Sequence, residues 1–146
     1  MIKKFHRSGC LFLLMLLVFL SPQCKKEKQP NEIPVVAVSI AIDPNSIQYI
    51  QLNAVNGSEY LTRGYRGILV FRASTNGFMA YERACPYDWS NANARLVLDS
   101  SGITTVCPTC KSKFILTDGS PYSGPSQYPM KQYQTSYNGS TLYIYN

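Results

Sequence analysis

The chain has 146 residues, of which 45% are hydrophobic and 12% aromatic, and this suits one domain with a packed core. Its eleven tyrosines favour strands over helices. The formal charge is +6, but three basic and no acidic residues fall in the first 23 positions, so the remainder carries 11 basic against 8 acidic residues, or +3. That remainder has no basic stripe, which argues against a nucleic-acid partner.

The first 23 residues have the pattern of a signal peptide. The basic residues Lys3, Lys4 and Arg7 precede an apolar run over 11–20. A membrane-spanning helix needs about 20 apolar residues, so the run is too short to be one. Cys24 follows, and the segment resembles a bacterial lipoprotein box, in which this cysteine carries lipid; ordinary cleavage nearby is the alternative. We therefore expect an exported protein of the bacterial envelope, attached to a membrane by lipid on Cys24.

The polar stretch 24–34 contains Pro30 and Pro34 and is predicted to be a linker, which leaves 35–146 as the domain. The apolar residues 35–42 predict a strand. The mixed segment 47–55 fits either a strand or a short helical turn.

Two hairpins are predicted, from the paired apolar runs 68–72 with 78–82 and 95–98 with 103–106. Asn76-Gly77 supplies the turn of the first, because this dipeptide favours tight hairpin turns. The first hairpin leads directly into Cys85-Pro86 and the second into Cys107-Pro108. Each cysteine loop should therefore be held at the end of a strand, where a rigid scaffold can present ligands.

The rest of the chain is also predicted to be β structure. It comprises a short strand over 114–116, a loop over 120–129, and a last hairpin from 131–135 and 141–145. Without a long helical period anywhere in this region, the expected fold class is all-β, with small antiparallel sheets or a barrel.

The second cysteine loop resembles that of Rieske [2Fe–2S] domains. From Cys107, the chain continues with Ser112, Phe114, Gly119 and then Gly124-Pro125 at the family's offsets. The resemblance covers about 67–145, although in the first loop it depends on Cys85-Pro86 alone. It implies a Rieske-like fold with a two-loop cluster-binding subdomain over about 84–125, covered by a loop of Ser123, Gly124 and Pro125.

Rieske domains hold their cluster with two cysteines and two histidines, whereas the only histidine of this chain is His6. Position by position, Cys85 and Cys107 match the two cysteines of the family. Cys110 stands where the second histidine belongs, and Tyr87 where the first belongs. The resemblance thus implies Cys85, Tyr87, Cys107 and Cys110 as metal ligands, with Asp88 as an alternative to Tyr87.

Three interpretations of this ligand set stay open. A variant [2Fe–2S] cluster would make the protein a one-electron carrier for a redox partner in the envelope rather than an enzyme. Zinc could occupy the same sulfur-rich group. In the third interpretation the site holds no metal, and two of the three thiols form a disulfide that stabilises a binding or structural module.

Overall fold

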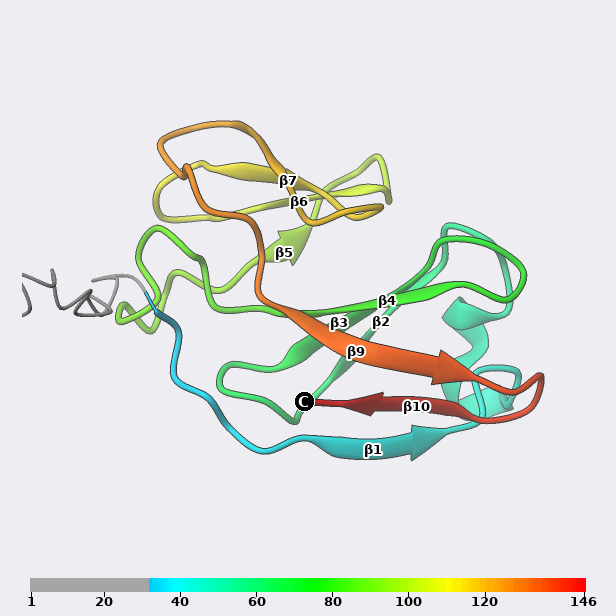
Figure 1. Cartoon of the computed structure of the whole chain (residues 1–146). Helices are drawn as coiled ribbons and strands as arrows, with labels where there is room; N and C mark the ends of the chain where they lie inside the picture. The colour runs from blue at the N-terminus through cyan, green and yellow to red at the C-terminus, as the bar shows by residue number, and fades with distance from the viewer. Residues whose placement is uncertain (1–31) are drawn as a thin grey trace, which may run out of the picture.

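The computed structural model describes residues 32–146, and nearly all of its regular structure is β strand, in two antiparallel sheets. In Figure 1 the smaller sheet, coloured yellow-green to orange, lies above the larger one. The larger sheet has the order β1 (Ser39–Ile42), β10 (Leu142–Tyr145), β9 (Gln132–Tyr137), β4 (Phe78–Glu82), β3 (Ile68–Arg72) and β2 (Ser58–Leu61). The smaller has the order β5 (Val97–Leu98), β6 (Thr104–Val106), β7 (Lys113–Ile115) and β8 (Pro121–Ser123). The predicted all-β fold class is confirmed.

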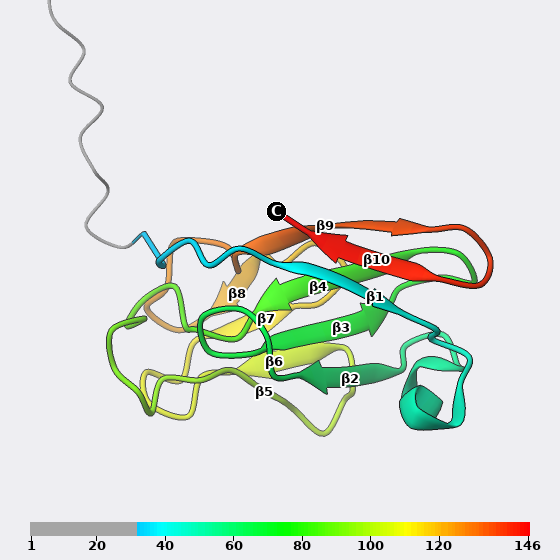
Figure 2. The ribbon, with the colours of Figure 1, turned by 90° about the horizontal axis from the view of Figure 1, so that it is seen from below.

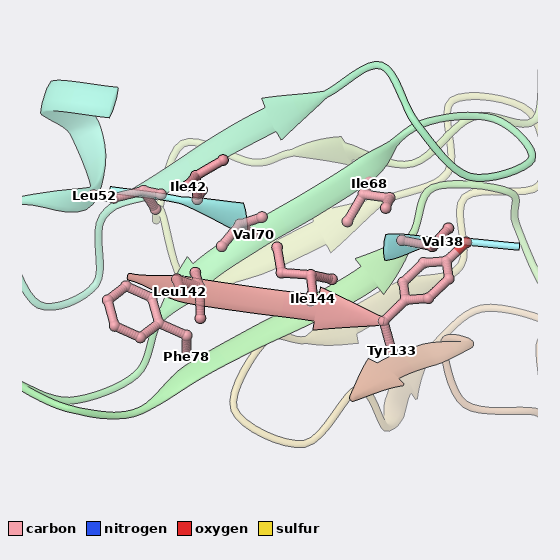
Figure 3. Close-up of a cluster of buried hydrophobic side chains, with 10 residues drawn as sticks. Val38, Ile42, Leu52, Ile68, Val70, Phe78, Tyr133, Leu142 and Ile144 are labelled. Atoms are coloured by element: carbon pink, nitrogen blue, oxygen red, sulfur yellow. The ribbon is translucent and has the colours of Figure 1, made fainter. Parts of the chain in front are cut away.

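One hydrophobic core lies on the inner face of the larger sheet, which brings together strands from both ends of the domain (Figure 3). It is formed by Val38, Ile42, Leu52, Ile68, Val70, Phe78, Ala80, Tyr133, Leu142 and Ile144. Figure 2 shows β1, β9 and β10 beside one another, with Ile40 opposite Ile144 and Ile144 opposite Thr135. The hairpin of β9 and β10 therefore connects β1, at one edge of the larger sheet, to β4 in the middle of that sheet.

A second core packs the other face of the larger sheet against the smaller one. Its members are Leu69, Phe71, Tyr81, Cys85, Ala94, Leu96, Cys107, Phe114, Leu116 and Met130. Side chains alternate between the two faces of a strand, so β3 contributes Ile68 and Val70 to the first core and Leu69 and Phe71 to the second. Two cysteines of the candidate site are thus part of the core that joins the sheets.

The segment 47–55 folds as a helical turn rather than a strand. Residues Ile47–Leu52 form a 3₁₀ segment, η2, and the buried guanidinium of Arg72 donates from Nη1 to the carbonyl oxygens of Leu52 at 2.9 Å and Asn53 at 3.3 Å. These bonds satisfy carbonyls that a helix end leaves without partners. The turn is therefore fixed to β3.

Several boundaries differ from the sequence-based expectation. The first strand begins at Ser39 rather than at residue 35, and β7 begins one residue earlier than predicted. β2 and β8 were not predicted, and β8 falls inside the stretch expected to be loop. Both strands are short and largely polar. They form because they pair with β3 and β7, and not because of an apolar pattern of their own.

The export pattern and Cys24 lie outside the described residues. No helix in the described part of the chain is long and apolar enough to cross a membrane. Ile33, at the end of the predicted linker, is buried, and Lys131 Nζ donates to the carbonyl oxygens of Ile33 and Pro34.

Candidate metal centre

The first cysteine loop leaves the end of β4 and turns sharply at Cys85. The backbone of Ala84 bridges Arg95, and Cys85 N–H donates to Ala94 O at 2.9 Å. A turn follows, in which Asp88 N–H donates to Cys85 O at 3.2 Å. The Cys85 side chain is completely buried, because these bonds hold its backbone against the second core.

The second cysteine loop connects β6 to β7 and closes on itself. Cys107 N–H donates to Ser112 O at 2.8 Å, and Lys111 N–H donates to Cys107 O at 3.0 Å. Lys111 has a φ of 64°, a left-handed conformation that is uncommon outside glycine. The loop buries Cys107 completely and leaves Cys110 partly exposed.

The two loops bring three sulfur atoms together. The Sγ atoms of Cys85, Cys107 and Cys110 lie within 4.8 Å of one another, and Cys85 Sγ is 3.6 Å from Cys110 Sγ. The other two proposed ligands are placed differently. The side chain of Tyr87 is 49% exposed, and Asp88 Oδ2 accepts a hydrogen bond from Asn91 Nδ2 at 2.9 Å and is not part of the converging group.

The loop expected to cover the site lies against Ser112, two residues beyond Cys110. Ser126 N–H donates to the buried Ser112 Oγ at 3.0 Å. A Cβ added to Gly124 would come within 2.5 Å of Ser112 Cα, so the two backbones are in close contact. Ser112 Oγ is also 3.2 Å from Cys110 Sγ. Ser112 therefore links the covering loop to the partly exposed cysteine.

The thiols of Cys85 and Cys110 differ in acidity. Burial raises the pKa of Cys85, because a buried site disfavours the charged thiolate. Desolvation also raises the pKa of Cys110, but hydrogen bonds from the side chain and backbone of Ser112, with smaller contributions from the other two cysteines, outweigh it and leave that pKa below its ordinary value. Of these two thiols, Cys110 is therefore both the more accessible and the more readily ionised.

Glu82, which the sequence analysis did not identify, fixes the backbone immediately before Cys85. The completely buried Glu82 accepts backbone hydrogen bonds from Tyr65 at 2.7 Å, Arg66 at 2.8 Å and Ala84 at 3.1 Å. The hydroxyl of Tyr133 donates to it at 2.7 Å. Its only sequence signal is an acidic residue at the end of an apolar strand, which does not reveal partners elsewhere in the chain.

The residues present do not fit a Rieske cluster. Such a cluster takes two protein ligands on each iron, with imidazoles on one of them, and residues 32–146 contain no histidine. Ligands of different irons must also stand apart, with the two irons between them. Cys85 and Cys110, which would serve different irons, instead have their sulfur atoms in contact at 3.6 Å.

The comparisons with known proteins find similarity among solved structures but not among sequences. No protein-family model matches the chain, and no curated protein matches it. Among solved structures, it is similar to a chain of the "Complex of reduced oxygenase and oxidized ferredoxin in carbazole 1,9a-dioxygenase", with a TM-score of 0.47 and 20% sequence identity, over 62% of this chain and 82% of that chain. The class that the fold and site define is an all-β protein with a three-cysteine group able to hold a metal.

Proposed function

We propose that this protein is a metal-binding module that holds a single divalent ion on the thiolates of Cys85, Cys107 and Cys110. The observation that carries the proposal is the mutual distance of the three sulfur atoms, all within 4.8 Å. Tetrahedral Zn²⁺ has sulfur ligands at about 2.3 Å, which places neighbouring sulfurs about 3.8 Å apart. The Cys85–Cys110 separation of 3.6 Å is close to that edge length.

The sulfur-rich ligand set favours a soft or borderline ion. Thiolates select Zn²⁺, Cu⁺ and iron–sulfur clusters over Mg²⁺ or Ca²⁺, and the missing imidazole pair disfavours the cluster. Zn²⁺ is therefore the ion we propose. Tyr87, exposed at the rim of the first loop, or a water molecule would take the fourth position.

The one-electron carrier implied by the Rieske resemblance is not what we propose, and neither is the envelope redox partner that it would serve. We also propose that the protein is located in the bacterial envelope. Its support is the sequence pattern of the first 23 residues and Cys24, which would attach the module to a membrane by lipid.

Cobalt binding tests the proposed site in the full-length chain. The reduced protein, titrated with Co²⁺ without oxygen, should saturate at one ion per chain, with thiolate-to-cobalt charge transfer in the near ultraviolet and the visible bands of tetrahedral Co²⁺. Added Zn²⁺ should remove both signals. Cys107→Ser should lose them, while Cys24→Ser, the matched exchange outside the site, should keep them.

Two outcomes would contradict the proposal. Uptake of two irons with acid-labile sulfide, after incubation with iron and sulfide, would establish a variant cluster in place of the single ion. Failure to bind Co²⁺, Zn²⁺ or iron would leave the metal-free module as the function.

A further inference from the structure

We propose that the same three-cysteine group carries out thiol–disulfide exchange, with Cys110 as the attacking thiol and Cys85 as the thiol that closes the internal disulfide. Closing that disulfide would remove two of the three metal ligands and release the ion, a consequence that rests on the proposed function. The exchange itself rests on the arrangement of the thiols alone.

The two sulfur atoms are already in contact. Cys85 Sγ and Cys110 Sγ are 3.6 Å apart, and a disulfide requires about 2.05 Å. The remaining movement is small, and the loop that carries Cys110 lies at the surface, where Pro108, Thr109 and Lys111 are exposed. The disulfide can therefore close by a shift of the second loop without a rearrangement of the core.

The two thiols differ in exposure, and this difference assigns a role to each of them. Cys85 is completely buried and cannot meet a disulfide on another molecule, whereas Cys110 is partly exposed. Exchange needs an accessible thiolate for the first attack and a second thiol in reach for the next. Cys110 meets the first requirement, and Cys85 meets the second.

Ser112 supports the attacking sulfur. Its Oγ already accepts a bond from Ser126 N–H at 3.0 Å and lies 3.2 Å from Cys110 Sγ. While Cys110 is protonated, its S–H donates to this oxygen. Once the proton has left, the hydroxyl of Ser112 can donate to the thiolate, and such charge-assisted bonds are the stronger kind.

The reaction balances with a disulfide-bearing oxidant, either a small-molecule disulfide or a disulfide on another protein. The Cys110 thiolate attacks one sulfur of the oxidant, forms a mixed disulfide and releases the other sulfur as a thiolate. Cys85 then attacks Cys110 Sγ and passes its proton to the sulfur that it displaces, which leaves as a thiol, while the first thiolate takes a proton from solvent. Two thiols of the chain are oxidised, the oxidant is reduced to two thiols, and Cys107 stays reduced.

Glutathione disulfide is the probe, applied to the full-length protein. After reaction and alkylation of the remaining thiols, trypsin should release a linked pair of peptides, 84–95 carrying Cys85 and 96–111 carrying Cys110, with the alkyl group on Cys107. Dithiothreitol under native conditions should reverse the link. Cys107→Ser should still form it, and Cys110→Ser should not.

Trapping tests the order of attack. In Cys85→Ser/Cys107→Ser no thiol of the site is left to resolve the intermediate, so glutathione should accumulate on Cys110. In Cys107→Ser/Cys110→Ser it should not accumulate on Cys85. Circular dichroism of each variant checks that the fold is retained. A Cys107–Cys110 link within peptide 96–111, a link that native reduction does not reverse, or no link at all would overturn the proposal.

Metal release is measured separately, by the Co²⁺ signal of the loaded wild-type chain. The signal should be lost in step with formation of the linked peptides and should return after reduction. Formation of the link with the Co²⁺ signal unchanged would overturn the release step. Formation of the link in a chain that binds no metal at all would overturn the metal-binding function and leave the exchange supported.

Discussion

At the scale of single residues, the geometry of the site depends on side chains that hold no metal. Glu82 fixes Ala84, the residue before Cys85, and at the same time binds the backbone of Tyr65 and Arg66. Gly64 lies so close that a Cβ there would be 2.7 Å from Glu82 Oε2. The loop around residue 65 and the first cysteine loop are therefore positioned by one carboxylate.

We expect Glu82→Gln to lower the free energy of unfolding by about 3 kcal/mol, since each carboxylate oxygen accepts two bonds and an amide nitrogen in place of either would face at least one backbone N–H donor. Urea unfolding followed by circular dichroism measures the loss. Glu59→Gln on β2 is the control. Glu59 is half-buried and, within residues 32–146, is bonded only to the adjacent Tyr60 N–H, so this change should alter stability by less than about 0.5 kcal/mol. Equal effects of the two substitutions would show that the hydrogen bonds of Glu82 do not hold the two loops in place.

The sequence indicated the three cysteines of the site but not Glu82, which supports the first cysteine loop. Cys85, Cys107 and Cys110 stand out because they follow two predicted hairpins at Rieske-like spacing, and their sulfurs do converge. Apart from Ala84, the partners of Glu82 lie 16 and 17 residues before it and 51 residues after it. No local pattern reports hydrogen bonds over such separations, so they depend on the tertiary fold.

At the scale of elements, prediction succeeded where a turn signal and an apolar run occur together. The hairpin of β3 and β4 has the bounds expected from the Asn76-Gly77 turn. β2 and β8 carry no such pattern, and β8 follows a register irregularity between Lys113 and Phe114. Their pairing is decided by the neighbouring strand, which a single sequence does not display.

The close contact between the covering loop and the second cysteine loop leads to a matched glycine test. Gly124 and Gly102 have similar positive φ values of 88° and 76°, so alanine at either should cost about 1 kcal/mol of backbone strain. Only at Gly124 does the new Cβ meet backbone, 2.5 Å from Ser112 Cα, whereas Gly102 faces open space. Gly124→Ala should therefore destabilise the domain by clearly more than Gly102→Ala.

Displacement of the covering loop should also be visible at the site. Loss of the Ser126–Ser112 bond would expose Cys110, and its alkylation by iodoacetamide, followed by peptide mass spectrometry, should be faster in Gly124→Ala than in Gly102→Ala. Identical alkylation rates and stabilities would mean that the loop does not cover the site.

At the scale of the whole molecule, Tyr81 connects the two sheets. It extends from β4 into the second core, and its hydroxyl donates to Leu116 O at 3.1 Å. Gly119 packs on its ring, where an added Cβ would lie 2.8 Å from Cε1. The all-β class followed from composition and turns, but this connection depends on how the sheets stack and was not predicted.

Because the fold holds Tyr81 neutral, the domain should lose stability in alkali. Burial, with a smaller contribution from Asp118, raises the pKa of Tyr81 from 10.0 to about 12. Between these two pH values the unfolded chain has lost the tyrosine proton and the folded chain has kept it. The free energy of unfolding should therefore fall by up to about 1.4 kcal/mol per pH unit for this group. Its stabilising effect is complete below pH 10 and is lost as the pH rises towards 12.

Urea unfolding at intervals from pH 9 to pH 12 measures this slope. The pKa values of Tyr133 and Cys85 are also raised, each chiefly by burial. The free energy of unfolding of the wild type should therefore fall more steeply with pH than one titrating group alone would cause. Tyr81→Phe should be less stable at neutral pH, because the hydrogen bond to Leu116 O is lost. Above pH 10, however, its free energy of unfolding should fall less steeply with pH, by about the contribution of one titrating group. Tyr122→Phe, at an exposed tyrosine, should keep the wild-type slope. An unchanged slope in Tyr81→Phe would mean that Tyr81 ionises as readily in the folded chain as in the unfolded one.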